Sequence, residues 1–337
     1  MTLPPATRTE PGRDINHSLG TNGLIVVCKR DGFVEFHDGT TFALQEEIKL
    51  PDFPHEVMLS PDRKKAYVSI YGNGQVGTNT EPGTRIAVLD IAGKKLDGFI
   101  EVAPFLAPHA MTFDKAGLLW ATAESSHALV YIDPARGVVL GHVETGTNRS
   151  HFMAANADGS KIYVPHRQLS FMSVIDTATK QVTKRIPDFR YECQGVCTAP
   201  DGNRVYQASS ARPEISIIDP VSDTVAGKFK IDGLWGKDGG DDFPPQLNRL
   251  RVSPDNRYLV VSFNQSRAAA VIDTEDPARQ HLFKLEKGPM GIAFGADMKH
   301  AFVTNHDEGT ISAIDLGAMK LDRACKTHLG PETMAFY

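Results

Sequence analysis

Seven positions recur along the chain at nearly constant spacing, and three of them are histidines. These positions are occupied by His55, His109, His151, Gln194, Asn248, Met290 and Glu332. The intervals between successive positions are 54, 42, 43, 54, 42 and 42 residues. Three imidazoles with a carboxylate or a water are a common ligand set for Zn, Fe, Cu or Mn. The spacing therefore predicts a divalent metal site of His55, His109, His151 and Glu332, if the fold brings these positions together.

A second set of chemically capable side chains follows the next apolar segment of each repeat. The candidates for general acid or base catalysis are His306, Glu124, Tyr71 and His166. His306 is the best matched of them to neutral pH. The candidates for substrate binding are Arg167, Arg30, Gln194, Asn248, Asn264 and Trp235. Arg167 and Arg30 would bind a carboxylate or phosphate through paired N–H donors.

Each of these residues also has a plainer interpretation. The dipeptides Pro54-His55 and Pro108-His109 fit a histidine that caps the start of a strand, and the seven positions together fit a polar channel without an ion. Polar side chains at the ends of strands are often solvated loop residues. The sequence leaves both interpretations open.

An internal repeat predicts the elements that would position these side chains. An apolar phrase ending in aspartate recurs at Asp90, Asp133, Asp176, Asp219, Asp273 and Asp315, and a weaker copy ends at Asp38. Each repeat of about 43 residues contains four short β-rich segments separated by turn residues, and helical periodicity is not sustained. Four strands per repeat are typical of a propeller blade. We therefore predict an all-β, seven-bladed β-propeller with four-stranded blades.

The two ends of the chain are expected to close the ring. The C-terminal PETMAFY matches the pattern of PHEVML at residues 54–59, whereas the region near residue 13 does not read as a strand. The C-terminal strand, residues 332–337, should thus complete the first blade and remove an exposed edge. The expected organisation is an N-terminal extension over residues 1–21 and one propeller domain over residues 22–337.

The candidate residues are expected at one face of the disc, because the loop entering each innermost strand and the loop leaving each second strand share a face. Two insertions, residues 72–83 and 233–246, fall at such loops and would wall a pocket at the channel mouth. A neutral surface insertion is the alternative. Strict alternation along the sixth innermost strand sends Arg249 and Arg251 away from Asn248, so both are left out of the predicted site.

The repeat resembles that of the YVTN-type seven-bladed propeller family, most clearly at Phe302-Val303-Thr304-Asn305. The resemblance covers residues 22–337 and implies the propeller fold. The stretches PHAMTFDKAGLLWATAE and SHFMAANADGSKIYVP are similar to the cytosolic 6-phosphogluconolactonase and carboxymuconate-cyclase group. That second resemblance implies chemistry on a lactone or a related acid, although the group is not marked by a histidine triad.

Composition excludes some classes of function. The 337 residues carry 36 Lys+Arg and 41 Asp+Glu, a formal net charge of −5, and the sequence contains no long basic run. This balance disfavours binding to nucleic acid or an anionic membrane. No apolar stretch fits a membrane span or a signal peptide, which favours a cytoplasmic protein, or a periplasmic one if a signal was removed. Four cysteines are too few for a disulfide scaffold, and no nucleotide or haem motif is present.

The sequence thus favours a metal-dependent enzyme that hydrolyses, eliminates or cyclises a small anionic lactone, ester, sugar acid or aromatic acid. A Cu or Fe redox enzyme on the same histidines is an alternative. A non-catalytic binding propeller is another, because the fold hosts many unrelated functions. The oligomeric state is left open.

Overall fold

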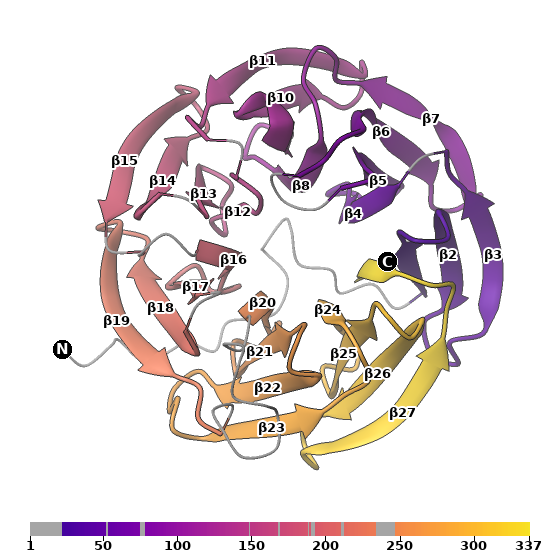
Figure 1. Cartoon of the computed structure of the whole chain (residues 1–337), viewed down its shortest axis with the longest axis vertical. Helices are drawn as coiled ribbons and strands as arrows, with labels where there is room; N and C mark the ends of the chain where they lie inside the picture. The colour runs from indigo at the N-terminus through magenta and orange to yellow at the C-terminus, as the bar shows by residue number, and fades with distance from the viewer. Residues whose placement is uncertain are drawn as a thin grey trace.

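Seven four-stranded antiparallel sheets form a ring around a central channel (Figure 1). A computed structural model describes residues 22–51, 53–74, 78–147, 149–167, 169–187, 189, 193–209, 212–233 and 247–337. Within these ranges the sole helical segment is the 3-10 turn η1 (Glu124–Ser126), and no helix has the length and apolar character needed to cross a bilayer. The predicted all-β, seven-bladed propeller is confirmed.

Within each blade the strands follow one another from the channel outward. Blade 1 contains, in that order, β28 (Pro331–Phe336), β1 (Gly23–Cys28), β2 (Phe33–Asp38) and β3 (Leu44–Lys49). Blade 2 contains β4 (Pro54–Leu59), β5 (Lys65–Gly72), β6 (Pro82–Asp90) and β7 (Lys95–Glu101). Blade 3 contains β8 (Pro108–Phe113), β9 (Leu119–Ala123), β10 (Ala128–Asp133) and β11 (Val138–Glu144). Blade 4 contains β12 (Ala154–Ala155), β13 (Lys161–Pro165), β14 (Phe171–Asp176) and β15 (Gln181–Pro187).

The remaining three blades follow the same order. Blade 5 contains β16 (Cys193–Thr198), β17 (Val205–Ser209), β18 (Glu214–Asp219) and β19 (Thr224–Lys230). Blade 6 contains β20 (Leu247–Val252), β21 (Tyr258–Phe263), β22 (Ala268–Asp273) and β23 (Gln280–Lys284). Blade 7 contains β24 (Pro289–Phe294), β25 (His300–Asn305), β26 (Thr310–Asp315) and β27 (Lys320–Lys326).

The ring closes where the C-terminal strand pairs with the first described strand, as predicted. Strand β28 pairs antiparallel with β1, with Leu24 opposite Phe336 and Val26 opposite Met334. Tyr337 extends the contact, because its ring packs directly against Gly23. A Cβ atom at position 23 would overlap the Tyr337 ring, so only glycine fits there. The closing strand removes the free inner edge that blade 1 would otherwise present.

The repeated aspartates have a structural role in the turn after the third strand. Asp133 Oδ1 accepts the backbone N–H groups of Ala135 and Arg136, and Asp315 Oδ1 accepts those of Gly317 and Ala318. Such a side chain replaces the missing strand partners and fixes a tight turn. This explains the regular spacing of these aspartates without any functional role.

A bulge at the start of the innermost strands determines which side chains face the channel. In β4, His55 and Glu56 together lie opposite the single residue Ser69, because pairing resumes only at Val57. The same extra residue occurs at the start of β8, β16, β20, β24 and β28. A bulge interrupts the strict alternation of side chains, so consecutive residues can point toward one place.

Hydroxyl groups on the second strands hold this bulge in place. The backbone N–H of Glu56 donates to Ser69 Oγ at 3.0 Å, and that of Arg249 donates to Ser262 Oγ at 3.3 Å. The Ser262 hydroxyl in turn donates to the Met290 carbonyl of the next blade at 2.8 Å. The bulged backbone is therefore satisfied and tied to its neighbour, which gives the site a fixed frame.

Candidate metal centre at the channel mouth

The repeating positions come together at the face where the innermost strands begin, which we call the start face. His55, His109, Gln194, Asn248, Met290 and Glu332 are each the second residue of an innermost strand, and His151 precedes the short β12. The ring centroids of His55 and His109 are 4.3 Å apart, and those of His109 and His151 are 3.6 Å apart. The register inferred from spacing thus places the three histidines beside one another.

Three donor atoms form the most compact group. His55, Glu56 and His109 each offer one ligand atom, and these atoms all lie within 4.8 Å of one another. Glu56 Oε1 is 3.4 Å from His55 Nδ1 and 3.6 Å from His109 Nε2. Ligands bound at about 2.1 Å in tetrahedral geometry would be roughly 3.4 Å apart. The carboxylate of this group is Glu56, although strict alternation would turn Glu56 away from His55. The spacing of the repeat had predicted Glu332 as the carboxylate ligand.

The two imidazoles in this group present unsatisfied nitrogens. His55 Nδ1 and His109 Nε2 are buried and have no hydrogen-bond partner among the described residues. The other nitrogen of His109, Nδ1, lies 2.9 Å from the His151 carbonyl oxygen, to which it can donate. That bond would place the proton on Nδ1 and leave a lone pair on Nε2, which is the usual arrangement of a metal-binding histidine.

Burial keeps the three histidines neutral. It lowers the pKa of His55, His109 and His151 well below the ordinary value, and the cations Lys29 and Arg249 lower the pKa of His55 further. Only a neutral imidazole has a lone pair for a metal ion. At neutral pH the cluster is therefore in the protonation state that a ligand set requires.

Glu124 connects two other predicted site residues. Its Oε1 accepts the Tyr71 hydroxyl at 3.0 Å, and its Oε2 lies 2.6 Å from His151 Nδ1. Glu124 is 1% exposed. Burial and the neighbouring Glu124 raise the pKa of Tyr71. Because both Glu124 oxygens are engaged inside the protein, the geometry gives Glu124 a positioning role toward His151.

Arg249 lies beside the cluster, so the alternation argument that turned it away was wrong. Its Nη1 and Nη2 donate to Glu56 Oε2 and Oε1 at 2.8 and 2.5 Å, and Nη2 also donates to Glu332 Oε1 at 3.2 Å. Burial alone would raise the pKa of Glu56, but the Arg249 guanidinium lowers it below the ordinary value. The exclusion of Arg249 assumed strict alternation, which the bulge in β20 breaks.

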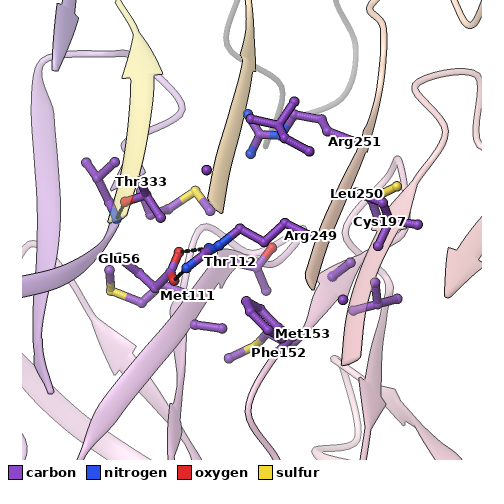
Figure 2. Close-up of a pocket in the computed structure, with 18 of the residues that line it drawn as sticks. Glu56, Met111, Thr112, Phe152, Met153, Cys197, Arg249, Leu250, Arg251 and Thr333 are labelled. Carbon is purple, nitrogen blue, oxygen red and sulfur yellow. Dashed lines mark hydrogen bonds and ion pairs between the residues drawn. The ribbon is translucent and has the colours of Figure 1, made fainter. Parts of the chain in front are cut away.

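The ion pair of Glu56 and Arg249 spans the channel from β4 to β20, which lie on opposite sides of it (Figures 1 and 2). A cavity of about 140 Å³ lies against this pair in the channel. Its lining comes from the innermost strand segments of all seven blades and includes Met58, Thr112, Phe152, Cys197, Arg251 and Met334. Arg251, also excluded by alternation, thus lines the channel as well.

Further cations and polar groups surround the cluster. Lys29 Nζ donates to the Gly74 carbonyl at 3.2 Å, so the first insertion reaches the start face. Burial lowers the pKa of Lys29, while the carboxylates Glu332 and Glu56 oppose this effect. The positive charge of Arg167 acts on both Tyr71 and His151. Lys29, which was not among the predicted site residues, thus joins Arg167 near the histidines.

The remaining predicted residues have mixed positions. His306 is half-buried, with Nε2 at 3.3 Å from Glu332 Oε2. Gln194 Nε2 donates to Asn248 Oδ1 at 3.2 Å, and Asn264 Nδ2 contacts the Met290 sulfur at 3.6 Å. These amides form a polar arc on blades 5 and 6, next to Met290 of blade 7.

Two predicted substrate-binding residues are not placed at the cluster. Arg30 forms an exposed ion pair with Asp307 at 2.6 Å. Trp235 and most of the second insertion lie outside the described residues. The described part of the first insertion continues the pairing of β5 and β6, with Gly72 opposite Pro82.

His166 is enclosed in the protein. Its Nδ1 and Nε2 each lie 2.8 Å from a serine hydroxyl, those of Ser150 and Ser173, and the residue is 0% exposed. Burial lowers the pKa of His166 to about 4. This geometry favours a structural role for a side chain that the sequence had placed among the catalytic candidates.

We expect His166 to make the fold sensitive to acid. Between about pH 6.5 and pH 4 the unfolded chain binds a proton at His166 that the folded protein does not, so stability falls as pH falls. The loss from this group should reach about 3 kcal/mol. Urea denaturation of wild type and His166→Asn across this range measures it, with His142→Asn at an exposed position as the control. Parallel curves for wild type and His166→Asn would contradict the expectation.

Comparison with known proteins supports the class that the fold and ring closure define, a seven-bladed β-propeller. A 141-residue stretch, 41% of the chain, is 28% identical to the Seven-bladed beta-propeller protein Rv1057 of Mycobacterium tuberculosis. An alignment of 130 positions that covers 34% of the chain is 32% identical to Antigen Lp49 of Leptospira interrogans. The matches span 33% and 25% of these relatives' own lengths. No family model matches the chain.

Solved structures share the architecture. A chain of the Kuenenia stuttgartiensis hydrazine synthase superposes with a TM-score of 0.69 and 18% identity, over 85% of this chain and 90% of that one. The dihydro-heme d1 dehydrogenase NirN, in complex with DHE, superposes with a TM-score of 0.63 and 15% identity, over 99% and 77%. At these identities the likeness concerns the fold, which in both cases belongs to an enzyme.

Proposed function

We propose that this propeller is a metal-dependent enzyme with its active site at the start face of the channel. One observation carries the proposal: within the part of the chain that the structure describes, His55 Nδ1 and His109 Nε2 are buried without a hydrogen-bond partner, and both lie beside Glu56 Oε1. Unsatisfied polar atoms at such depth are costly in a protein interior unless a ligand uses them. A divalent ion bound there supplies Lewis-acid chemistry, polarising a carbonyl or activating a water.

The groups around the triad have the chemistry for an anionic substrate. Lys29 and Arg167 supply positive charge next to the histidines. Because His151 Nδ1 is engaged by Glu124, proton exchange with a substrate would use His151 Nε2. His306, half-buried beside Glu332, is a second candidate for proton transfer. His151 and Glu332 also remain candidate additional ligands of the ion.

The reaction that best suits this set is hydrolysis of a small anionic lactone or ester, or elimination or cyclisation of a sugar acid or aromatic acid. The resemblance of residues 108–124 and 150–165 to the lactonase and cyclase group supports that choice. A nitrogen-rich donor set also suits Cu and Fe, which leaves a redox enzyme as the second candidate. The identity of the resident metal separates the two.

The test is the metal content of the purified protein, measured by elemental mass spectrometry beside a His109→Ala variant. We expect close to one equivalent of Zn, Mn, Fe or Cu in the wild type and its loss in the variant. Zn or Mn would favour the hydrolase or lyase, whereas Cu or Fe would favour the redox enzyme. Retention of the metal by His109→Ala would place the ion outside the proposed centre. Protein that takes up no metal after dialysis against these ions would leave a metal-free enzyme or a binding propeller.

A further inference from the structure

Arg249 occupies an unusual position for a charged side chain. It starts on blade 6, crosses the channel and ends between two carboxylates, those of Glu56 on blade 2 and Glu332 on blade 1. Its guanidinium also lies 5.0 Å from the centre of the Phe152 ring on the way across. Figure 2 shows the paired contacts with Glu56 in the middle of the channel.

The guanidinium and the candidate metal site share one oxygen atom. Glu56 Oε1 is 2.5 Å from Arg249 Nη2, 3.4 Å from His55 Nδ1 and 3.6 Å from His109 Nε2. An ion bound between the two histidines and Glu56 would therefore stand next to a guanidinium that holds the same carboxylate. Two cations at such short range repel strongly in a site shielded from water.

A second carboxylate and a cavity lie next to the Arg249 guanidinium, and both are available to it when it releases Glu56. Its Nη2 already donates to Glu332 at 3.2 Å, and the cavity of about 140 Å³ lies directly against its side chain. The guanidinium could thus keep one carboxylate partner while leaving the other, so that its charge is not left unpaired. The exchange would take place by rotation of the flexible side chain.

We propose that Arg249 is an internal competitor of the metal ion, and that guanidinium and ion bind Glu56 in turn. This inference rests on the proposed metal site. With Arg249 on Glu56, the guanidinium offsets the charge of that carboxylate and the affinity for a divalent ion is low. When Arg249 withdraws, Glu56 joins His55 and His109 as a ligand. Arg249 thereby sets the concentration of metal at which the site fills.

Arg249→Met tests this inference, because it removes the charge and keeps an unbranched side chain of similar length. We expect the dissociation constant for Mn²⁺, measured by isothermal titration on chelator-treated protein, to fall about tenfold or more. Arg249→Lys keeps a cation that cannot pair with both Glu56 oxygens. Its dissociation constant for Mn²⁺ should therefore lie between those of the wild type and Arg249→Met. Arg257→Met, at an exposed position in the same blade, is the matched control and should bind as the wild type does.

The outcomes separate this inference from the proposed function. Tighter binding by Arg249→Met, abolished when His109→Ala is added, supports both. Unchanged or weaker binding by Arg249→Met, with normal binding by the wild type, overturns the competitor and makes Arg249 a positioning residue for Glu56. Absence of Mn²⁺ and Zn²⁺ binding in all of these proteins overturns both. If Arg249→Met fails to fold, the direction of the Arg249→Lys change decides.

Discussion

Glu56→Gln is expected to lower the affinity for a divalent ion by about 100-fold. Substitution of a residue that only hydrogen-bonds to a metal ligand lowers metal affinity by about 10- to 100-fold, and loss of a ligand itself should cost at least as much. Glu56 Oε1 lies beside both unsatisfied histidine nitrogens, and the amide removes the negative charge that a ligand oxygen needs. Titration of chelator-treated protein with Mn²⁺ or Zn²⁺ measures the change. Circular dichroism confirms that the variant is folded.

Glu332→Gln is the matched control, because it removes one buried carboxylate from the same cluster. Glu332 Oε1 is 3.7 Å from His55 Nε2, but Glu332 lies outside the compact triad. We expect the affinity for the ion to fall about threefold or less, because Glu332→Gln removes one negative charge near the site. A larger loss for Glu332→Gln than for Glu56→Gln would reverse the ligand assignment and restore the set expected from spacing alone.

Arg249→Met is expected to destabilise the metal-free protein by about 3–5 kcal/mol, since it leaves a buried carboxylate pair without its cation. The side chains of Arg249, Glu56 and Glu332 are 12%, 12% and 5% exposed, so the carboxylates that lose their partner are largely buried. Urea denaturation with a chelator present, at pH 7 to 8, measures the free energy of unfolding.

The double variant Arg249→Met/Glu56→Gln identifies the cause of that loss. Removing Glu56 together with Arg249 should recover a large part of the stability, because only one of the two buried carboxylates, that of Glu332, is then left without the guanidinium. Arg257→Met again serves as the control and should change stability little. Equal losses in the single and double variants would show that packing of the arginine side chain, and not its charge, stabilises the channel.

The fold could be predicted from the sequence because each blade repeats the same local rules. Asp133 and Asp315 each accept backbone N–H groups of the turn that follows the third strand. Because this turn recurs in each blade, the aspartates recur in the sequence and reveal the repeat length. The match of the C-terminal PETMAFY to PHEVML predicted the closing strand β28, which the structure extends from Pro331 to Phe336. The shared register then placed His55, His109 and His151 together.

The site was predicted less completely because the innermost strands do not alternate regularly at their start. Glu56 and Arg249 follow His55 and Asn248 directly, and period-two reasoning sends them to the opposite side. The bulge reverses that conclusion, and its signal is slight: the hydroxyl residues Ser69 and Ser262 at one position of the second strands. Contacts across the ring, such as Arg249 with Glu56, depend on the closed propeller and have no local signature.

The proposed centre is one metal ion bound by His55, His109 and Glu56 at the start face of the channel. Anomalous diffraction from crystals of metal-loaded protein, recorded at the absorption edge of the metal, tests it directly. We predict one strong peak at about 2.0–2.2 Å from His55 Nδ1, His109 Nε2 and a Glu56 carboxylate oxygen. A peak elsewhere, or crystals soaked in the metal that show none at these atoms, would contradict it.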